Sequence, residues 1–236
     1  MSRRSLSIAA ASALAALALP AAAYAVVATL TNPADPAAVA SCPGTTAIPC
    51  TVVSRTTAVQ VEVGGVRDPF RVKASGRIVG WQITLSSPTA SQIKYFDSTE
   101  GGTARAAIAV IRQVRALDYR LEYEGPTVHL QPYFGQTIVL ALPNSLPVTK
   151  GDMIALSVPT WAPALDLQAG HRAAWRASRG KTQCSSVTEQ TAQISPGTVT
   201  QYYCIYRTAL VDFGAIEITD PVATPTGTPS QRRLIR

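Results

Sequence analysis

The sequence has few of the side chains from which most catalytic and metal centres are built. It contains two histidines and four cysteines, and no two cysteines stand in a C-x-x-C spacing. The histidines are also far in sequence from each other and from the cysteines, so spacing argues against a structural zinc site. An aspartate-rich calcium loop and a G-x-S-x-G elbow are absent as well. Neither Gly64-Gly65 nor Gly101-Gly102 is followed by the Lys-Ser/Thr of a phosphate loop. We therefore expect no metal and no cofactor.

Charged and aromatic residues are also sparse, at 15% and 6% of the 236 residues. The net charge of +7 comes largely from arginines near the two ends, and the middle of the chain is close to balanced. Such a distribution is a weak argument for a nucleic-acid partner, and we expect none. No internal repeat of the length found in propellers or solenoids is present. The 47% hydrophobic content is sufficient for one globular domain with its own core.

The first 25 residues have the pattern of a cleaved signal peptide. A start with Arg3 and Arg4 is followed by an alanine and leucine run over 6–19 and by Ala23-Tyr24-Ala25, an A-x-A cleavage site. The run is too short to span a bilayer comfortably, which favours cleavage after Ala25 over an uncleaved membrane anchor. Both Sec and twin-arginine export remain open. We predict a secreted or cell-envelope-associated protein with no transmembrane span in the mature chain.

Export to an oxidising compartment explains the four cysteines, which we expect to form two disulfides. Three connectivities are possible. We favour the pairing of sequence neighbours, Cys42 with Cys50 and Cys184 with Cys204. The first bond would pin the start of the domain, and the second would tie a polar loop to the strand that follows it. Closing loops of these lengths stabilises a fold by about 2–4 kcal/mol each.

The segment 76–86 is the feature around which we expect the domain to be organised. Its apolar residues recur at every second position, namely at Val79, Trp81, Ile83 and Leu85. This is the period of a strand with one apolar face. Such a strand needs a second sheet to cover Trp81, and Gly80 beside it indicates a close approach by another part of the chain.

Most of the remaining chain has the pattern of short strands separated by turn signals. The expected strands cover 51–54, 58–63, 70–74, 76–86, 91–96, 103–117, 119–123, 127–130, 136–142, 153–158, 172–178, 198–207 and 210–218. Segment 103–117 would suit a helix by propensity, but its alternation favours a long strand. Segment 136–142 is apolar on both faces and is expected at the centre of a sheet. Pro143-Asn144-Ser145 is expected to turn the chain.

These features predict an all-β fold, an antiparallel two-sheet sandwich with jelly-roll-like connectivity. The sandwich domain is expected to cover 42–219, after the signal peptide and a linker over 26–41. Residues 220–236 are rich in proline, threonine and arginine, and we expect a disordered tail there.

Several of these segments together resemble a known group of proteins. They are the export signal, the early cysteine pair leading into Cys50-Thr51-Val52-Val53, the strand 76–83, Val110-Ile111-Arg112 and the segment 146–156. In these features the chain is similar to a loose group of uncharacterised secreted β-sandwich proteins of high-GC bacteria. The resemblance covers roughly 42–178. Because its motifs are strand and turn patterns, it implies a fold and no activity, and the loop from Cys184 to Cys204 is not part of it.

Two sets of side chains are candidates for a binding surface. Sugar-binding sandwiches expose aromatic stacking platforms, and the aromatic candidates here are Trp161, Trp175, Tyr202, Tyr203 and Tyr206. Trp175 and Tyr203, taken singly, are more typical of a core, whereas Trp161 lies between two prolines in an expected loop, where a large ring is harder to bury. The basic candidates around Trp175 are Arg172, Arg176, Arg179 and Lys181. They would contact an anionic polymer or form a solubilising face.

Catalytic residues are harder to find. A glycosidase needs two carboxylates about 5–10 Å apart, but two glutamates spaced like Glu122 and Glu124 on a strand are more typical of a solvated face. His129 and His171 have no nucleophile motif beside them. We therefore predict a non-catalytic secreted or cell-surface protein that binds glycan or another envelope component, such as an extracellular polysaccharide or cell-wall component. The alternatives are a self-assembling structural surface protein and an extracellular glycoside hydrolase with Glu122, Glu124 or Asp166 at the floor of a cleft.

Overall fold

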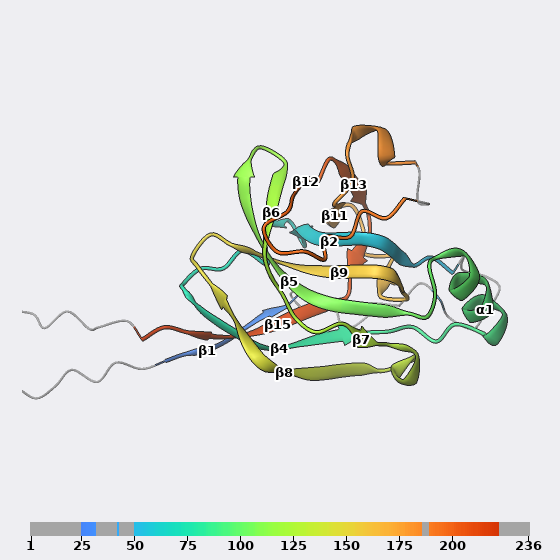
Figure 1. Cartoon of the computed structure of the whole chain (residues 1–236), viewed down its shortest axis with the longest axis horizontal. Helices are drawn as coiled ribbons and strands as arrows, with labels where there is room; N and C mark the ends of the chain where they lie inside the picture. Colours follow the sequence, from blue (N-terminus) through green and yellow to red (C-terminus); the bar gives the residue numbers. More distant parts are fainter. Residues whose placement is uncertain (1–24, 32–41, 43–49, 186–188, 222–236) are drawn as a thin grey trace, which may run out of the picture. The chain divides into compact units, whose positions relative to one another are not determined.

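The computed structural model describes residues 25–31, 42, 50–185 and 189–221. In this part of the chain the fold is an antiparallel all-β sandwich with a single α-helix, α1 (Ala90–Thr99), as Figure 1 shows. This confirms the predicted fold class. One compact unit runs from Ala25 to Asp220. The predicted signal peptide, the predicted tail from residue 222 onward and residues 32–41 of the predicted linker lie outside the described residues.

The smaller of the two main sheets has four strands in the order β1-β15-β4-β8. Its members are β1 (Val27–Thr31), β15 (Phe213–Thr219), β4 (Gly76–Thr84) and β8 (Thr137–Val148). All neighbours are antiparallel. Because β1 lies where the sequence predicted a linker, the domain begins earlier in the chain than residue 42.

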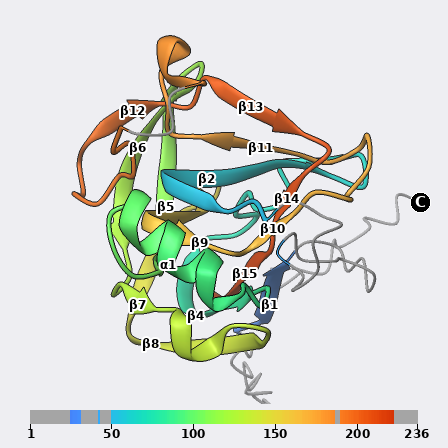
Figure 2. The same cartoon turned by 90° about the vertical axis from the view of Figure 1, so that its right-hand side faces the viewer.

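The larger sheet has nine strands and is curled, as Figure 2 shows. Its main order is β12-β6-β5-β9-β2-β11-β13, with β3 added on β2 and β7 on β5. The bounds are β2 (Val53–Val63), β3 (Val66–Arg67), β5 (Arg105–Arg115), β6 (Asp118–Glu124), β7 (Val128–His129), β9 (Met153–Ala162), β11 (Ala174–Ala177), β12 (Val199–Gln201) and β13 (Cys204–Arg207). Segment 103–117 is therefore a strand, as its alternation predicts.

Three shorter elements complete the described fold. They are the two-stranded sheet of β10 (Leu165–Asp166) and β14 (Leu210–Val211) and the 3-10 helices η1 (Gln131–Tyr133) and η2 (Lys181–Gln183). The chain passes repeatedly between the two main sheets, from β2 to β4, from β4 to β5, from β6 to β8, from β8 to β9 and finally into β15. This is the jelly-roll-like connectivity that the strand count predicts.

The core between the sheets contains Trp81, which is almost fully buried. The register of β4 against β8 shifts between Ile78 and Gly80, and this irregularity places both Ile78 and Trp81 in the core. Val79 is only half-buried, so its predicted place on the apolar face is wrong. A Cβ atom on Gly80 would lie 3.0 Å from the carbonyl oxygen of Leu140. This confirms the predicted close approach of another chain segment.

Segment 91–96 belongs to helix α1 and not to a strand. The helix begins with a capping box, in which the Thr89 hydroxyl accepts the Gln92 N–H at 3.3 Å and the Gln92 side chain accepts the Thr89 N–H at 2.7 Å. These two bonds satisfy amide groups that would otherwise lack partners at a helix start. The alternation of Ile93 and Tyr95 is too short to outweigh this local signal, and the strand prediction is therefore wrong.

Two expected chain breaks are also absent. Strand β9 runs through Pro159, because its pairing with β2 shifts between Ser54 and Thr56 and leaves Arg55 at a φ of 47°. Strand β8 continues past Pro143-Asn144-Ser145 to Val148, and it lies at the edge of its sheet and not at the centre. Elsewhere, 70–74 is not a strand and contains an isolated bridge from Arg71 to Met153, and the expected strand 198–207 is divided into β12 and β13.

Both disulfides join the sequence neighbours. Cys42 is bonded to Cys50, and Cys184 to Cys204, as predicted. The first bond closes a loop in the chain just before β2. The second joins the end of η2 to the start of β13.

The Asp212 carboxyl group is buried, with 8% of the residue exposed. Its Oδ2 atom has no hydrogen-bond partner among the described residues. Burial, with a smaller contribution from the charge of Asp166, raises the pKa of Asp212 to about 7 from the ordinary 3.8. The folded state therefore binds this proton more tightly than the unfolded state does. The contribution of this proton to the free energy of unfolding is fully present below about pH 4 and is lost as the pH rises to about 7.

We expect Asp212→Asn to remove this pH dependence, because an amide does not ionise. The variant should match the wild type in free energy of unfolding near pH 4 and exceed it by up to about 4 kcal/mol at pH 8. Urea denaturation at pH 4, 6 and 8 measures the difference. Asp220→Asn removes an exposed carboxyl and is the control. Parallel curves for Asp212→Asn and wild type at all three pH values would contradict the assignment.

Candidate functional site

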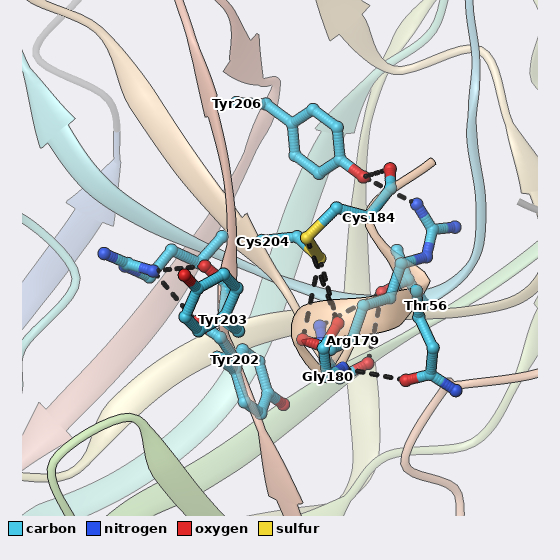
Figure 3. Close-up of a disulfide and its surroundings, with 11 residues drawn as sticks. Thr56, Arg179, Gly180, Cys184, Tyr202, Tyr203, Cys204 and Tyr206 are labelled. Carbon is cyan, nitrogen blue, oxygen red and sulfur yellow. Dashed lines mark hydrogen bonds between the residues drawn. A yellow bond between two sulfur atoms is a disulfide. The ribbon is translucent and has the colours of Figure 1, made fainter. Parts of the chain in front are cut away.

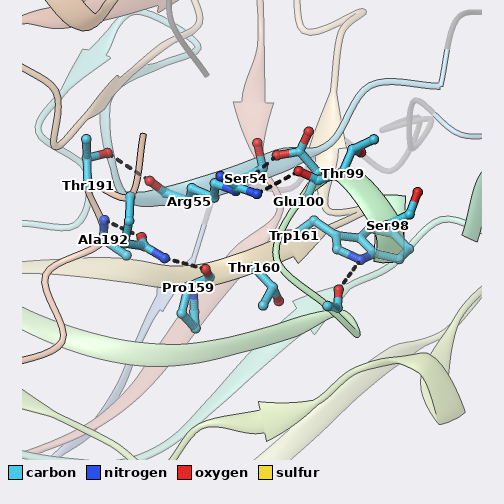
Figure 4. Close-up of polar contacts among 12 residues, drawn as sticks. Ser54, Arg55, Ser98, Thr99, Glu100, Pro159, Thr160, Trp161, Thr191 and Ala192 are labelled. Carbon is cyan, nitrogen blue, oxygen red and sulfur yellow. Dashed lines mark hydrogen bonds and ion pairs between the residues drawn. The ribbon is translucent and has the colours of Figure 1, made fainter. Parts of the chain in front are cut away.

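Trp161, the strongest sequence candidate for an exposed stacking platform, is fully buried. Its ring packs against Phe96 of α1, with ring centroids 5.1 Å apart, and against Phe134 at 5.5 Å. The indole N–H donates to the Asp97 carboxylate and to the carbonyl of Gly102, both at 3.0 Å. Figure 4 shows the ring lying beside the end of the helix near Ser98. The prediction of exposure is wrong because β9 continues through the flanking proline and α1 covers the ring.

Tyr202 is also fully buried, in a second and smaller core on the opposite face of the large sheet. Its hydroxyl donates to the side-chain oxygen of Gln193 at 2.6 Å, and its ring contacts Tyr119 edge-on at 5.0 Å. Gln193 is itself held by the Thr57 hydroxyl, which accepts the Gln193 N–H at 2.8 Å. The segment 190–203 therefore crosses the face of the sheet and is fixed there. Tyr202 has a structural role and is not available as a platform.

Two basic candidates differ in their surroundings. Arg176 on β11 donates to the carbonyl of Tyr202 at 3.0 Å and to that of Tyr203 at 2.7 Å, so it fastens the crossing segment to the sheet. Arg172 is exposed, and its side chain lies over Gly65 in the turn between β2 and β3. The predicted basic cluster around Trp175 is thus divided between different structural contacts.

Trp175 and Tyr206 are two predicted aromatic residues whose rings the fold brings into contact. They are opposite each other in the antiparallel pair β11–β13, and their rings are stacked with centroids 4.4 Å apart and an interplanar angle of 23°. A pocket of about 410 Å³ lies beside this pair. Its wall is formed mainly by apolar and aromatic residues and by one disulfide-bonded cysteine, and includes Val52, Leu165, Leu167, Trp175, Cys184, Tyr206 and Ala209. This volume falls in the range of small-molecule sites.

The pocket has a buried positive charge and no carboxylate in its lining. Arg179 and Arg207 line it, and no aspartate or glutamate is among the described residues that do so. Arg207 also lines another pocket, which it shares with Glu62 and Asp68. Arg179 is 3% exposed and donates to the Tyr206 hydroxyl at 2.9 Å and to the Ser54 carbonyl at 2.7 Å. Its Nε atom and the indole nitrogen of Trp175 have no hydrogen-bond partner among the described residues. A buried guanidinium without a carboxylate favours an anion nearby.

Figure 3 shows the disulfide that borders this pocket, with Tyr206 and Arg179 close to it. The Tyr206 hydroxyl lies 3.4 Å from the carbonyl of Cys184, to which it donates. The disulfide, the arginine and the stacked rings therefore form one connected group. Sequence inspection identified Tyr206 and Trp175 but missed Arg207, Leu165 and Leu167, which come from separate segments.

The carboxylates considered for catalysis have other surroundings. The Glu122 carboxylate accepts from Arg120 at 2.7 Å and lies 3.7 Å from Arg112. Burial raises the pKa of Glu124. Neither glutamate lines any of the four described pockets, and neither does Asp166. Both histidines are exposed. Within the described residues, no group of three or more metal-ligating side chains is present.

Comparison with known proteins adds no identification. No family model, curated protein or solved structure matches the chain. The resemblance to the secreted proteins of high-GC bacteria thus stays a prediction. In the described part of the chain, no helix has both the length and the apolar character needed to cross a membrane.

We expect the double substitution Cys184→Ser with Cys204→Ser to lower the free energy of unfolding by about 2–4 kcal/mol, because the unfolded chain regains freedom. It should also loosen the crossing segment 190–203. The amide of Tyr202, which donates to the Leu117 carbonyl at 2.7 Å, reports this loosening through faster hydrogen exchange.

The matched control is Cys42→Ser with Cys50→Ser, which removes the other disulfide. It should lower stability and leave local exchange at Tyr202 unchanged relative to the rest of the domain. Equal exchange at Tyr202 in both double variants would show that the second disulfide does not hold the crossing segment.

Proposed function

We propose that the chain is an exported, non-catalytic binding module that takes an acidic glycan of the cell envelope into the pocket beside Trp175 and Tyr206. One observation carries the proposal: an aromatic and apolar wall stands next to two guanidinium groups with no carboxylate among the described lining residues. The two disulfides fit a protein of an oxidising compartment, and the predicted signal peptide fits export.

The apolar wall and the guanidinium groups of the pocket match the ring and the carboxylate of an acidic sugar, respectively. Aromatic rings and aliphatic side chains pack against the apolar C–H faces of a sugar ring. Guanidinium groups bind carboxylates with charge-assisted hydrogen bonds, which are stronger than bonds between neutral groups. Arg207 is exposed and also lines another pocket, which it shares with Glu62 and Asp68. Arg179 is buried behind Tyr206 and supplies the positive charge for which the lining has no carboxylate. Among glycans, this favours acidic ones over neutral ones.

We also propose that the chain has no catalytic role. Glu122 is engaged by two arginines, and the described pockets contain none of the three carboxylates considered as acid or base. A glycosidase arrangement needs two carboxylates facing each other across a cleft. Binding without turnover is the activity that these contacts support.

The test is binding of the purified exported protein to an array that contains acidic glycans and their neutral counterparts. We expect retention of the acidic members. Arg207→Gln should weaken that binding by about five- to tenfold, because an exposed charge at the rim contributes about 1 kcal/mol. Titration calorimetry with one retained glycan measures the change.

Lys94→Gln is the matched control, since it removes one exposed positive charge from α1, far from the pocket in sequence. It should bind like the wild type. Equal losses in Arg207→Gln and Lys94→Gln would indicate a general charge effect and not a site. An array with no retained acidic glycan would overturn the proposed ligand.

A further inference from the structure

Strand β8 leaves one edge of the small sheet open. It pairs with β4 on one side, and among the described residues no strand pairs with its other side. Figure 1 shows β8 lengthwise at the lower margin of the fold, below β4. The open part is the regular stretch 137–142, which precedes the shift in register against β4.

The hydrogen bonds of the sheet show which backbone groups face the open side. The Leu85 N–H donates to the Gln136 carbonyl at 2.9 Å, so Gln136 points toward β4. Backbone groups alternate in direction along an antiparallel strand, and Ile138 and Leu140 therefore also point toward β4. The N–H and C=O groups of Thr137, Val139 and Ala141 point to the open side. All three residues are exposed, and Val139 is 62% exposed.

Within the stretch 137–142, this edge lacks the features by which natural sheets avoid pairing with another chain. Exposed edges usually carry a lysine, a proline, an inward charge or a bulge within the strand. The stretch 137–142 reads Thr-Ile-Val-Leu-Ala-Leu and contains no charge, no proline and no glycine. Its β-branched and aliphatic residues favour an extended conformation. The stretch ends at Pro143, which has no N–H to offer.

We propose that the open edge of β8 pairs with the same edge of a second copy of this chain, antiparallel about a twofold axis that passes through Val139. In this register Val139 is opposite Val139 of the other copy, and Thr137 is opposite Ala141. The residues that face each other are then those whose backbone N–H and C=O groups point to the open side. Each facing pair can therefore exchange two hydrogen bonds. A register centred on Leu140 would place Thr137 opposite Pro143 and lose a donor.

The charge pattern makes a second copy the favoured occupant. A twofold pairing brings identical segments together, so any charged side chain in the stretch would face a like charge nearby. The stretch contains none, and it is compatible with itself over its whole length. Side chains opposite each other also share a face, so the half-buried Ile138 meets Leu140 on the core side, and the exposed Val139 meets Val139 on the outer side.

The pairing leaves the proposed pocket free. The pocket is lined from β2, β10, β11, β13 and the segments next to them, and β8 contributes no residue to it. A dimer would therefore carry two pockets, and a polymeric ligand that reaches both would be held with higher avidity than by one. The dimer itself does not depend on the identity of the ligand, so the two proposals can fail separately.

Sedimentation equilibrium of the purified exported protein over a range of concentrations tests the pairing. We expect a reversible monomer–dimer equilibrium. Val139→Pro removes an N–H that points to the open edge and leaves the bonds to β4 in place, and proline is tolerated at such edge positions. It should weaken dimerisation roughly tenfold or more. Val139→Thr keeps the N–H and the branched side chain, and should dimerise like the wild type.

Cysteine cross-linking tests the register without relying on proline. Residues that face each other in a hydrogen-bonded antiparallel pair have Cα atoms about 5.5 Å apart, within reach of a disulfide. Val139→Cys should therefore cross-link to itself under mild oxidation. Thr137→Cys and Ala141→Cys should each fail alone and should cross-link when the two variants are mixed.

Three results would overturn the proposal. One is a wild-type protein that stays monomeric at every concentration, which would leave the edge to a different partner. A second is a Val139→Cys variant that stays uncross-linked although its circular dichroism and thermal melting match the wild type. Dimerisation that persists unchanged in a folded Val139→Pro variant would place the interface elsewhere and would equally contradict it.

Discussion

The burial of Trp81 between the two main sheets is the constraint on which the rest of the fold depends. One sheet cannot cover an indole ring, so β4 requires the large sheet opposite it, and β4 in turn fixes β15 and β8 as its neighbours. The stacking of Phe70 on Phe213, with centroids 4.7 Å apart, belongs to the same core. Gly80 lets β8 approach the strand that carries the tryptophan. The open edge of β8 is thus a consequence of where the core places this strand.

A second layer of packing decides where the pocket lies. The segment 190–203 crosses the large sheet on the face away from Trp81 and is fastened by Gln193, Tyr202 and Arg176. The Cys184–Cys204 disulfide links the beginning of this excursion to β13. Because Ala177 is opposite Cys204, the antiparallel register places Trp175 opposite Tyr206 two residues farther on. The stacked pair at the pocket is therefore set by the register of β11 against β13.

The fold could be predicted from two-residue alternation and the disulfides from cysteine spacing, but several local features could not. The alternation in 103–117 correctly outweighed its helix propensity, whereas in 91–96 a capping box decided for a helix. Trp161 seemed exposed because prolines flank it, yet a shift of register allows β9 to continue past Pro159. Among the pocket residues, Trp175 and Tyr206 could be recognised from the sequence as aromatic candidates for a binding surface. Its other walls come from β10 and the start of β2, and no local pattern reveals that these segments meet.

The energetics of Arg179 support the proposed anionic ligand. Burying a guanidinium without a carboxylate has a large desolvation penalty, and two hydrogen bonds to neutral oxygens offset only part of it. An apolar side chain of similar length would fill the same space without that penalty. Stability alone therefore does not explain an arginine at this position. An anionic group bound at the exposed Arg207 would lie in the field of the buried charge, and the interaction of the two charges would offset the penalty in the bound state.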